Sequence, residues 1–252
     1  MIDHAEYAQA GRKAVAAASI VCREVQNNLE QVRSVTKDDK SPVTVADYAS
    51  QAVVAMMLKQ QLGEFVLVAE EASNFLRDED NAMLLDAAVA AAKEVWEDAT
   101  ADDLLDAIDL GAGDTTHHKF WTLDPIDGTK GFLRNQQYAI ALGFIEDGTP
   151  TIGIMGCPNL PINMSMPLDE RDEHGCLYYA IQGEGVWETR SDDGNAESIR
   201  ITRLDHDSSE EISVCASVEK AHSNVSDTDR ILEWIEQQGL GEGAPPQRKR
   251  FQ

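Results

Sequence analysis

A short segment near the middle of the chain carries two carboxylates at a spacing that suits metal-assisted phosphate chemistry. Asp124 and Asp127 stand three residues apart, with Pro125 and Ile126 between them. Because proline fixes its own φ, we predict that both carboxylates and the Ile126 carbonyl converge on one point. Magnesium prefers such hard oxygen donors and keeps several waters, which leaves positions for a phosphate and a nucleophile. The alternative is a plain surface turn, because Asp-Pro and Asp-Gly are ordinary turn dipeptides.

The same spacing argues against a covalent phosphatase mechanism. Enzymes that form an aspartyl-phosphate use Asp-x-Asp-Gly-Thr, in which the nucleophile and the acid-base residue are two apart. In this chain the two aspartates are three apart, so two metal ligands and an activated water fit better than a nucleophilic Asp. Gly128 and Thr129 follow at the predicted start of a helical turn, where unpaired N–H groups can bind a phosphate.

Carboxylates also follow an earlier strand-like run. Residues 65–69 read Phe-Val-Leu-Val-Ala and are followed at once by Glu70 and Glu71. Residues 119–123 form a similar run that ends in a carboxylate at Asp124. Because the interior of a buried strand rejects carboxylates, we predict that these side chains stand at the ends of two strands.

Hydrophobic periodicity predicts the elements that must position these residues. Helices are predicted over 7–28, 45–62 and 82–96, with a possible fourth within 98–114. Strands are predicted over 138–145, 151–157 and 176–182 as a meander, with Asp147-Gly148 as the first hairpin turn. A further strand over 212–216 and a helix over 228–238 follow. Residues 241–252 combine Gly, Pro and three consecutive basic residues, which predicts a disordered tail.

Composition limits the class of partner. The chain of 252 residues is 42% hydrophobic, enough for one large domain or two modest ones. Its formal charge of −24 repels nucleic acids and anionic membranes, and it would also repel a phosphorylated substrate unless metal cations invert the local potential. The four cysteines are scattered, and neither a secretory signal nor a membrane-spanning run is evident, so we expect a cytoplasmic protein with reduced thiols.

Several motifs in order resemble one known family. Residues 121–129 read Trp-x-x-Asp-Pro-x-Asp-Gly-Thr after a predicted strand, with Glu-Glu upstream at 70–71, and this resembles the inositol monophosphatase superfamily. Gly-Phe at 131–132 resembles the 3′(2′),5′-bisphosphate nucleotidase branch, since inositol phosphatases usually have Asn-Phe there. Residues 41–48 and 217–223 are similar to that branch's other landmarks, and the resemblance runs from about residue 7 to about residue 246.

The resemblance implies roles for individual residues. Glu70, Asp124 and the Ile126 carbonyl would bind a first magnesium, and Asp124 with Asp127 would share in a second, for a total of two or three ions. Asp47 and Thr129 would orient or activate the attacking water. The substrate would contact Gly128, Thr129, Lys130, His222 and Ser223. The role of Glu71 stays open, because adjacent carboxylates usually divide into one ligand and one supporting or solvated group.

The resemblance also implies an α/β fold and an activity. The fold is the α+β layered sugar-phosphatase fold (αβαβα), with an N-terminal α+β domain over 1–195 and the start of an incomplete C-terminal α/β domain over 196–240. The Trp-Asp-x-Ala-Ala-Gly motif, whose Asp completes the second metal site in the family, is absent from the sequence. The implied reaction is hydrolysis of 3′-phosphoadenosine 5′-phosphate, a by-product of sulfate assimilation, to AMP and phosphate, with sensitivity to lithium.

Two other functions stay open. The first is an inositol phosphate phosphatase, which shares the chemistry but differs in substrate. The second is a non-catalytic fragment that binds metal or phosphate without turnover, because the C-terminal layer is expected to be incomplete. The sequence does not determine the oligomeric state; a monomer is our expectation.

Overall fold

The computed structural model describes residues 3–28, 45–162, 165–167, 170–202, 213–216, 230–231, 233–234, 237 and 247–250. The chain divides into two units, Met1–Ile201 and Thr202–Gln252. The predicted domain boundary at residue 195 lies before this division, because a last short strand pairs with its neighbour and extends the first unit to Ile201.

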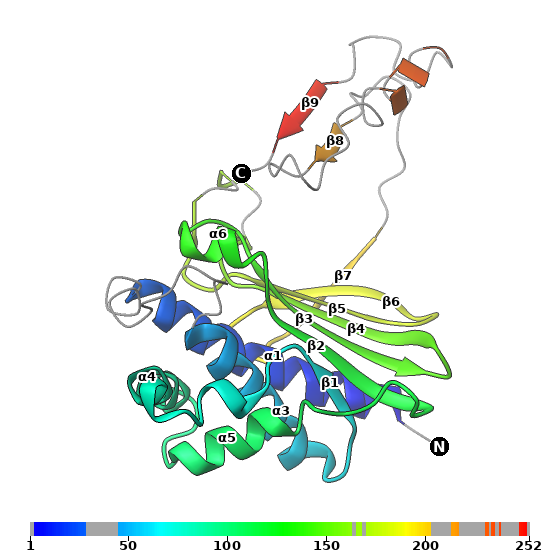
Figure 1. Ribbon diagram of the computed structural model, residues 1–252. Helices are drawn as coiled ribbons and strands as arrows, with labels where there is room; N and C mark the ends of the chain where they lie inside the picture. Colours follow the sequence, from blue (N-terminus) through cyan, green and yellow to red (C-terminus); the bar gives the residue numbers. More distant parts are fainter. Residues whose placement is uncertain are drawn as a thin grey trace. The chain divides into compact units, whose positions relative to one another are not determined.

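Two long helices cover one face of the main sheet (Figure 1). Helix α1 (His4–Asn27) begins at Asp3, whose Oδ1 accepts the N–H of Ala5 at 2.9 Å. Helix α3 (Val45–Leu62) is buried from Val45 to Met56, where most of its residues are apolar or small. It packs against α1 and against the two shorter helices α4 (Ala82–Ala92) and α5 (Ala101–Asp109). These four helices confirm the helices predicted from periodicity, with α4 shorter than expected.

The main sheet has seven strands in sequence order. Strand β1 (Leu67–Ala69) is parallel to β2 (Lys119–Asp127), and every later neighbour is antiparallel, which confirms the predicted meander. The later strands are β3 (Ala139–Glu146), β4 (Thr149–Cys157), β5 (Cys176–Ile181), β6 (Gly185–Arg190) and β7 (Ile199–Ile201). Asp147 and Gly148 both have positive φ and form the predicted hairpin turn. The sequence analysis missed β6 and β7.

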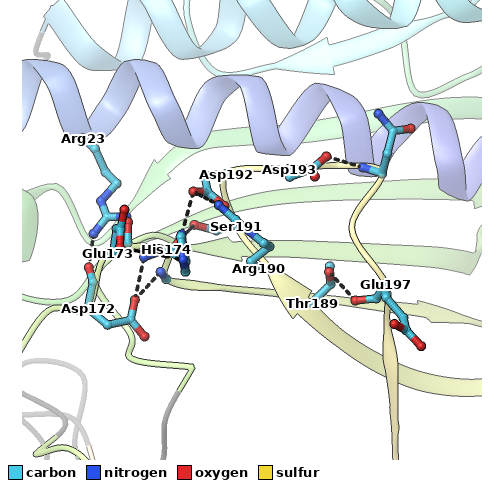
Figure 2. Close-up of polar contacts among 12 residues, drawn as sticks. Arg23, Asp172, Glu173, His174, Thr189, Arg190, Ser191, Asp192, Asp193 and Glu197 are labelled. Atoms are coloured by element: carbon cyan, nitrogen blue, oxygen red, sulfur yellow. Dashed lines mark hydrogen bonds and ion pairs between the residues drawn. The ribbon is translucent and has the colours of Figure 1, made fainter.

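The connection from β4 to β5 is fastened to helix α1 (Figure 2). The guanidinium of Arg23 donates to the backbone carbonyls of Asp172 and Glu173. The Asp172 carboxylate accepts backbone N–H groups of the turn that follows, including that of His174 at 2.9 Å. These bonds satisfy backbone groups that a long surface connection would otherwise leave to water.

The second unit contains a two-stranded parallel pair, β8 (Ser213–Ala216) and β9 (Gln247–Arg250). The predicted strand over 212–216 is thereby confirmed. Within the segment 241–252, for which a disordered tail is predicted, residues Gln247–Arg250 pair with β8. Five residues of the predicted helix 228–238 are helical, and the others lie outside the described residues. None of the described helices is both long and apolar enough to cross a bilayer.

Candidate metal and phosphate site

The carboxyl ends of β1 and β2 bring the first two predicted ligands together. The two strands are parallel, and the last paired residues are Ala69 and Leu123. Glu70 and Asp124 each follow directly, so parallel pairing places them side by side at one edge of the sheet. The prediction that both carboxylates stand at a strand end holds for Glu70. It is wrong for Asp124, because β2 continues to Asp127.

A bulge in β2 explains how Asp124 and Asp127 can face the same side. Asp124 pairs with Ala141 and Asp127 with Ala139, so three steps along β2 match two steps along β3. Residues three apart in a regular strand point to opposite faces, and one extra residue restores a common face. The N–H of Ile126 donates to Asp124 Oδ1 at 3.1 Å, which closes the bulge locally.

Two adjacent polar side chains of α3, Ser50 and Gln51, form hydrogen bonds with the backbone next to Asp124 and Glu70. Ser50 Oγ donates to the Pro125 carbonyl in the bulge at 3.1 Å. Gln51 forms two hydrogen bonds with the backbone of Glu71: its Nε2 donates to the Glu71 carbonyl at 2.7 Å, and its Oε1 accepts the Glu71 N–H at 2.9 Å. Both side chains are fully buried. The Ser50 bond lies in the interior, and the two Gln51 bonds to Glu71 are partly shielded from water. The distance between the two strand ends is therefore set by α3.

Asp47 stands one helical turn before this pair, in the first turn of α3. Its side chain is buried, with 4% exposure. Its charge contributes to raising the pKa of Glu71, which places its field at the same strand end. Asp47, Ser50 and Gln51 thus share one face of α3, because residues three and four apart lie above one another on a helix.

The electrostatics of the site show an excess of negative charge. Burial, followed by the charges of Asp47, Glu70 and Asp124, raises the pKa of Glu71 to about 7. Burial and then the charges of Glu70 and Asp127 raise the pKa of Asp124 above its usual value. The N–H of Ile126 opposes the second shift only in part. Crowded carboxylates of this kind are stabilised by a bound cation.

The donor chemistry fits magnesium. The candidate ligands are carboxylate oxygens and one backbone carbonyl, the hard donors that this ion prefers. No three His, Cys, Asp or Glu side chains come close enough together to hold an ion within the part of the chain that is described. The assignment of Glu70, Asp124, Ile126 and Asp127 as ligands therefore stays a prediction.

The residues after the bulge form a short helix, α6 (Thr129–Leu133), as predicted. Gly128 precedes it with a φ of 89°, a left-handed conformation that only glycine adopts without strain. Thr129 Oγ1 donates to the Ile126 carbonyl at 3.2 Å, which ties the helix start to the bulge. A Cβ on Gly131 would lie 2.1 Å from the carbonyl oxygen of Gln137, so the close return of the chain requires glycine there.

The structure brings most of the predicted site residues to one edge of the sheet, namely Asp47, Glu70, Asp124, Ile126, Asp127, Gly128 and Thr129. Lys130 is exposed on α6. His222 and Ser223 lie outside the described residues, as do residues 41–44 of the predicted landmark around Asp47.

Sequence analysis missed the two polar residues that position the site. Ser50 and Gln51 lie three and four residues after Asp47, in a part of the helix whose other residues are mostly apolar. This spacing is a signal that they share a face with Asp47. The role of Glu71 is not fixed by the sequence; in the structure burial, and after it the charges of Asp47, Glu70 and Asp124, raises the pKa of this carboxyl to about 7.

Comparison with known proteins finds a family model and named relatives that match most of the chain. The sequence model of the inositol monophosphatase family matches residues 3–243. A 3′(2′),5′-bisphosphate nucleotidase of Arabidopsis thaliana is 39% identical over 95% of this chain and 70% of its own length. A 3′(2′),5′-bisphosphate nucleotidase of Schizosaccharomyces pombe is 34% identical over 88% of this chain and 66% of its own length. The chain therefore spans about two thirds of the length of these relatives.

Solved structures support the fold. CysQ from Bacteroides thetaiotaomicron, a bacterial member of the inositol monophosphatase family, superposes with a TM-score of 0.56 at 17% identity, covering 97% of this chain and 72% of that one. The Thermotoga maritima IMPase superposes with a TM-score of 0.54 at 17% identity, covering 99% of this chain and 68% of that one. The predicted mixed α/β fold is thereby confirmed.

Proposed function

The chain belongs to the inositol monophosphatase family, and from this premise we propose that it is a metal-dependent phosphomonoesterase acting on 3′-phosphoadenosine 5′-phosphate. Water cleaves the 3′-phosphate ester, and the products are AMP and inorganic phosphate. The relatives named as 3′(2′),5′-bisphosphate nucleotidases support this choice of substrate.

One observation carries the proposal: parallel pairing of β1 and β2 sets Glu70 beside Asp124, and the bulge in β2 brings Asp127 to the same side. Together with the Ile126 carbonyl, these residues would hold two or three magnesium ions. Bound magnesium supplies positive charge that offsets the carboxylates, polarises the phosphate and lowers the pKa of water. The raised pKa values of Glu71 and Asp124 support a site built for such charge compensation.

The chain's own residues orient the reactants. Asp47 lies buried at the start of α3, where its carboxylate can accept a proton from the attacking water. Thr129 Oγ1 donates to the Ile126 carbonyl, which leaves its oxygen lone pairs able to accept a hydrogen bond from the same water. The backbone N–H groups at the start of α6 and the exposed Lys130 would bind the phosphate. The hydrogen bond from Ser50 to the Pro125 carbonyl ties α3, which carries Asp47, to the bulge that precedes Thr129.

We also propose a cytoplasmic monomer that is inhibited by lithium, and substrate contacts from His222 and Ser223. The family resemblance of residues 217–223 supports the last point. An inositol phosphate phosphatase is the second candidate, because the family model that matches most of the chain carries that name.

The test is magnesium-dependent phosphate release by this chain from 3′-phosphoadenosine 5′-phosphate, with inositol 1-phosphate in parallel. Asp127→Asn removes one proposed ligand and keeps the side-chain shape. As a matched control, Asp147→Asn makes the same change in the hairpin turn between β3 and β4. We expect release from the nucleotide that Asp127→Asn abolishes and Asp147→Asn preserves.

Each other outcome selects an alternative. Release from inositol 1-phosphate alone would favour the second candidate. No release from either substrate, together with magnesium binding in calorimetry, would show that this chain is a non-catalytic fragment of the kind described above.

A further inference from the structure

Helix α6 is too short to be stable by itself. It has five residues, and isolated helices of that length do not form in water. It nevertheless lies directly after Asp127 and Gly128, so its position decides where the proposed phosphate-binding groups stand. Its stability must come from contacts with the rest of the first unit.

Phe132 supplies the apolar part of these contacts. Its side chain is fully buried, and its ring meets that of Tyr138 edge to face, with centroids 4.9 Å apart. Such contacts hold the helix against the core but do not fix its rotation, because hydrophobic attraction is non-directional. Directional bonds are needed for that.

Gln26 on helix α1 provides one directional bond. Its side chain is 3% exposed, and its Nε2 donates to the Phe132 carbonyl at 3.0 Å. Its Oε1 accepts two hydrogen bonds, from Asn159 Nδ2 at 2.9 Å and from Arg171 Nη1 at 3.0 Å. The amide therefore joins α1, α6 and the connection between β4 and β5.

Asn159 provides further bonds to the segment that follows α6. Its side chain is 1% exposed, and its Nδ2 also donates to the Gln136 carbonyl at 2.6 Å. Its backbone carbonyl accepts from Gln137 Nε2 at 2.9 Å. Its Oδ1 has no hydrogen-bond partner among the described residues. A buried oxygen without a partner is costly, so the side chain is kept in place by what its Nδ2 donates.

We propose that Gln26 and Asn159 are positioning residues for the reaction: they fix α6, and with it Gly128 and Thr129, relative to Glu70, Asp124 and Asp127. This inference rests on the proposed function. It assigns a role in catalysis to two residues remote from the carboxylates, one on α1 and one just after β4.

Two variants of Gln26 separate its bond to α6 from its bonds to the β4–β5 connection. Gln26→Leu removes all three hydrogen bonds. Gln26→Glu keeps the oxygen that accepts from Asn159 and Arg171 but removes the donor to the Phe132 carbonyl. If the bond to α6 supports catalysis, both variants should lose activity to the same extent. If the bonds to the β4–β5 connection support it, only Gln26→Leu should lose activity.

The control is Thr189→Val in strand β6. Thr189 is 2% exposed, and its Oγ1 donates to the Glu197 carbonyl at 3.0 Å (Figure 2). The substitution also removes one hydrogen bond of a buried side chain, but in strand β6 and not in the segments whose bonds hold α6. It therefore reports how a general loss of stability changes amide exchange and steady-state kinetics.

The first readout is hydrogen–deuterium exchange of the backbone amides of residues 128–137 in the chain without substrate. We expect at least tenfold faster exchange in both Gln26 variants and no change in Thr189→Val. The second readout is steady-state kinetics with 3′-phosphoadenosine 5′-phosphate. We expect kcat to fall about tenfold or more in both Gln26 variants with KM within threefold, because small misplacements of reacting groups cost rate.

Unchanged exchange at 128–137 in Gln26→Glu would overturn the proposal, and so would faster exchange with wild-type kcat. If the wild-type chain releases no phosphate while exchange rises as expected, the proposed function fails and the structural role of Gln26 stands. The two failures are therefore distinguishable.

Discussion

Glu71 is predicted to destabilise the metal-free chain at alkaline pH, and Glu71→Gln is predicted to stabilise it. Burial and the neighbouring carboxylates raise the pKa of Glu71 from 4.5 to about 7. A carboxyl whose pKa is raised in the folded state does not lower the free energy of unfolding below its unfolded pKa. The cost grows as pH rises from 4.5 and is complete above 7.

The magnitude follows from the shift. Each pKa unit corresponds to about 1.4 kcal/mol, so full ionisation costs about 3.4 kcal/mol at most. Glu71 is only partly buried, and solvent screening reduces this figure to about 1–2 kcal/mol. For a chain of this size that is a rise in Tm of roughly 3–7 °C for Glu71→Gln. At pH 6 the gain is smaller, about three-fifths of its value at pH 8.5.

The assay is thermal unfolding in EDTA at pH 8.5 and pH 6, followed by circular dichroism. Glu97→Gln, at an exposed carboxylate, makes the same change in net charge and serves as the control. It should leave Tm within about 1 °C, since exposed substitutions are usually nearly neutral. A Glu71→Gln variant that melts at or below the wild-type temperature at pH 8.5 would refute the claim that crowded carboxylates strain this site.

Three further predictions follow from single contacts. Gln51→Leu removes the side-chain partner of two part-buried backbone groups of Glu71 and should lower the free energy of unfolding by about 1–3 kcal/mol in urea titrations. A loss below about 0.5 kcal/mol would contradict the role of Gln51 in holding this segment. Gly131→Ala should destabilise by more than about 2 kcal/mol, because its Cβ would meet the Gln137 carbonyl, whereas Gly153→Ala, with open space around its Cβ, is the control and should change little. Burial alone would raise the pKa of Asp192, but hydrogen bonds from Arg190 and His174 lower it to about 2. These bonds therefore stabilise the fold above about pH 4, and the stabilisation is lost as pH falls towards 2. Asp192→Asn should flatten this part of the acid-unfolding curve, and an unchanged curve would argue against the contacts shown in Figure 2.

Much of the fold follows from local sequence. The periodicity of 7–28 and 45–62 predicts α1 and α3 because an apolar face repeats at helical spacing. The Asp147-Gly148 dipeptide predicts the first hairpin because both residues tolerate positive φ. Strands β6 and β7 were missed. Strand β7 has only three residues, too short a run for alternation to predict a strand.

Residue types and their order along the chain are enough to identify the donors of the candidate site: carboxylates after two apolar runs, a proline between Asp124 and Asp127, and a glycine before a helical turn. Three features depend on contacts between distant segments: the parallel pairing of β1 and β2, the bulge that turns Asp127 to the side of Asp124, and the bonds by which Gln51 and Gln26 hold the segment after β1 and α6. A residue's own type sets which bonds it can make, whereas its partners are brought to it by the packing of segments far apart in the chain.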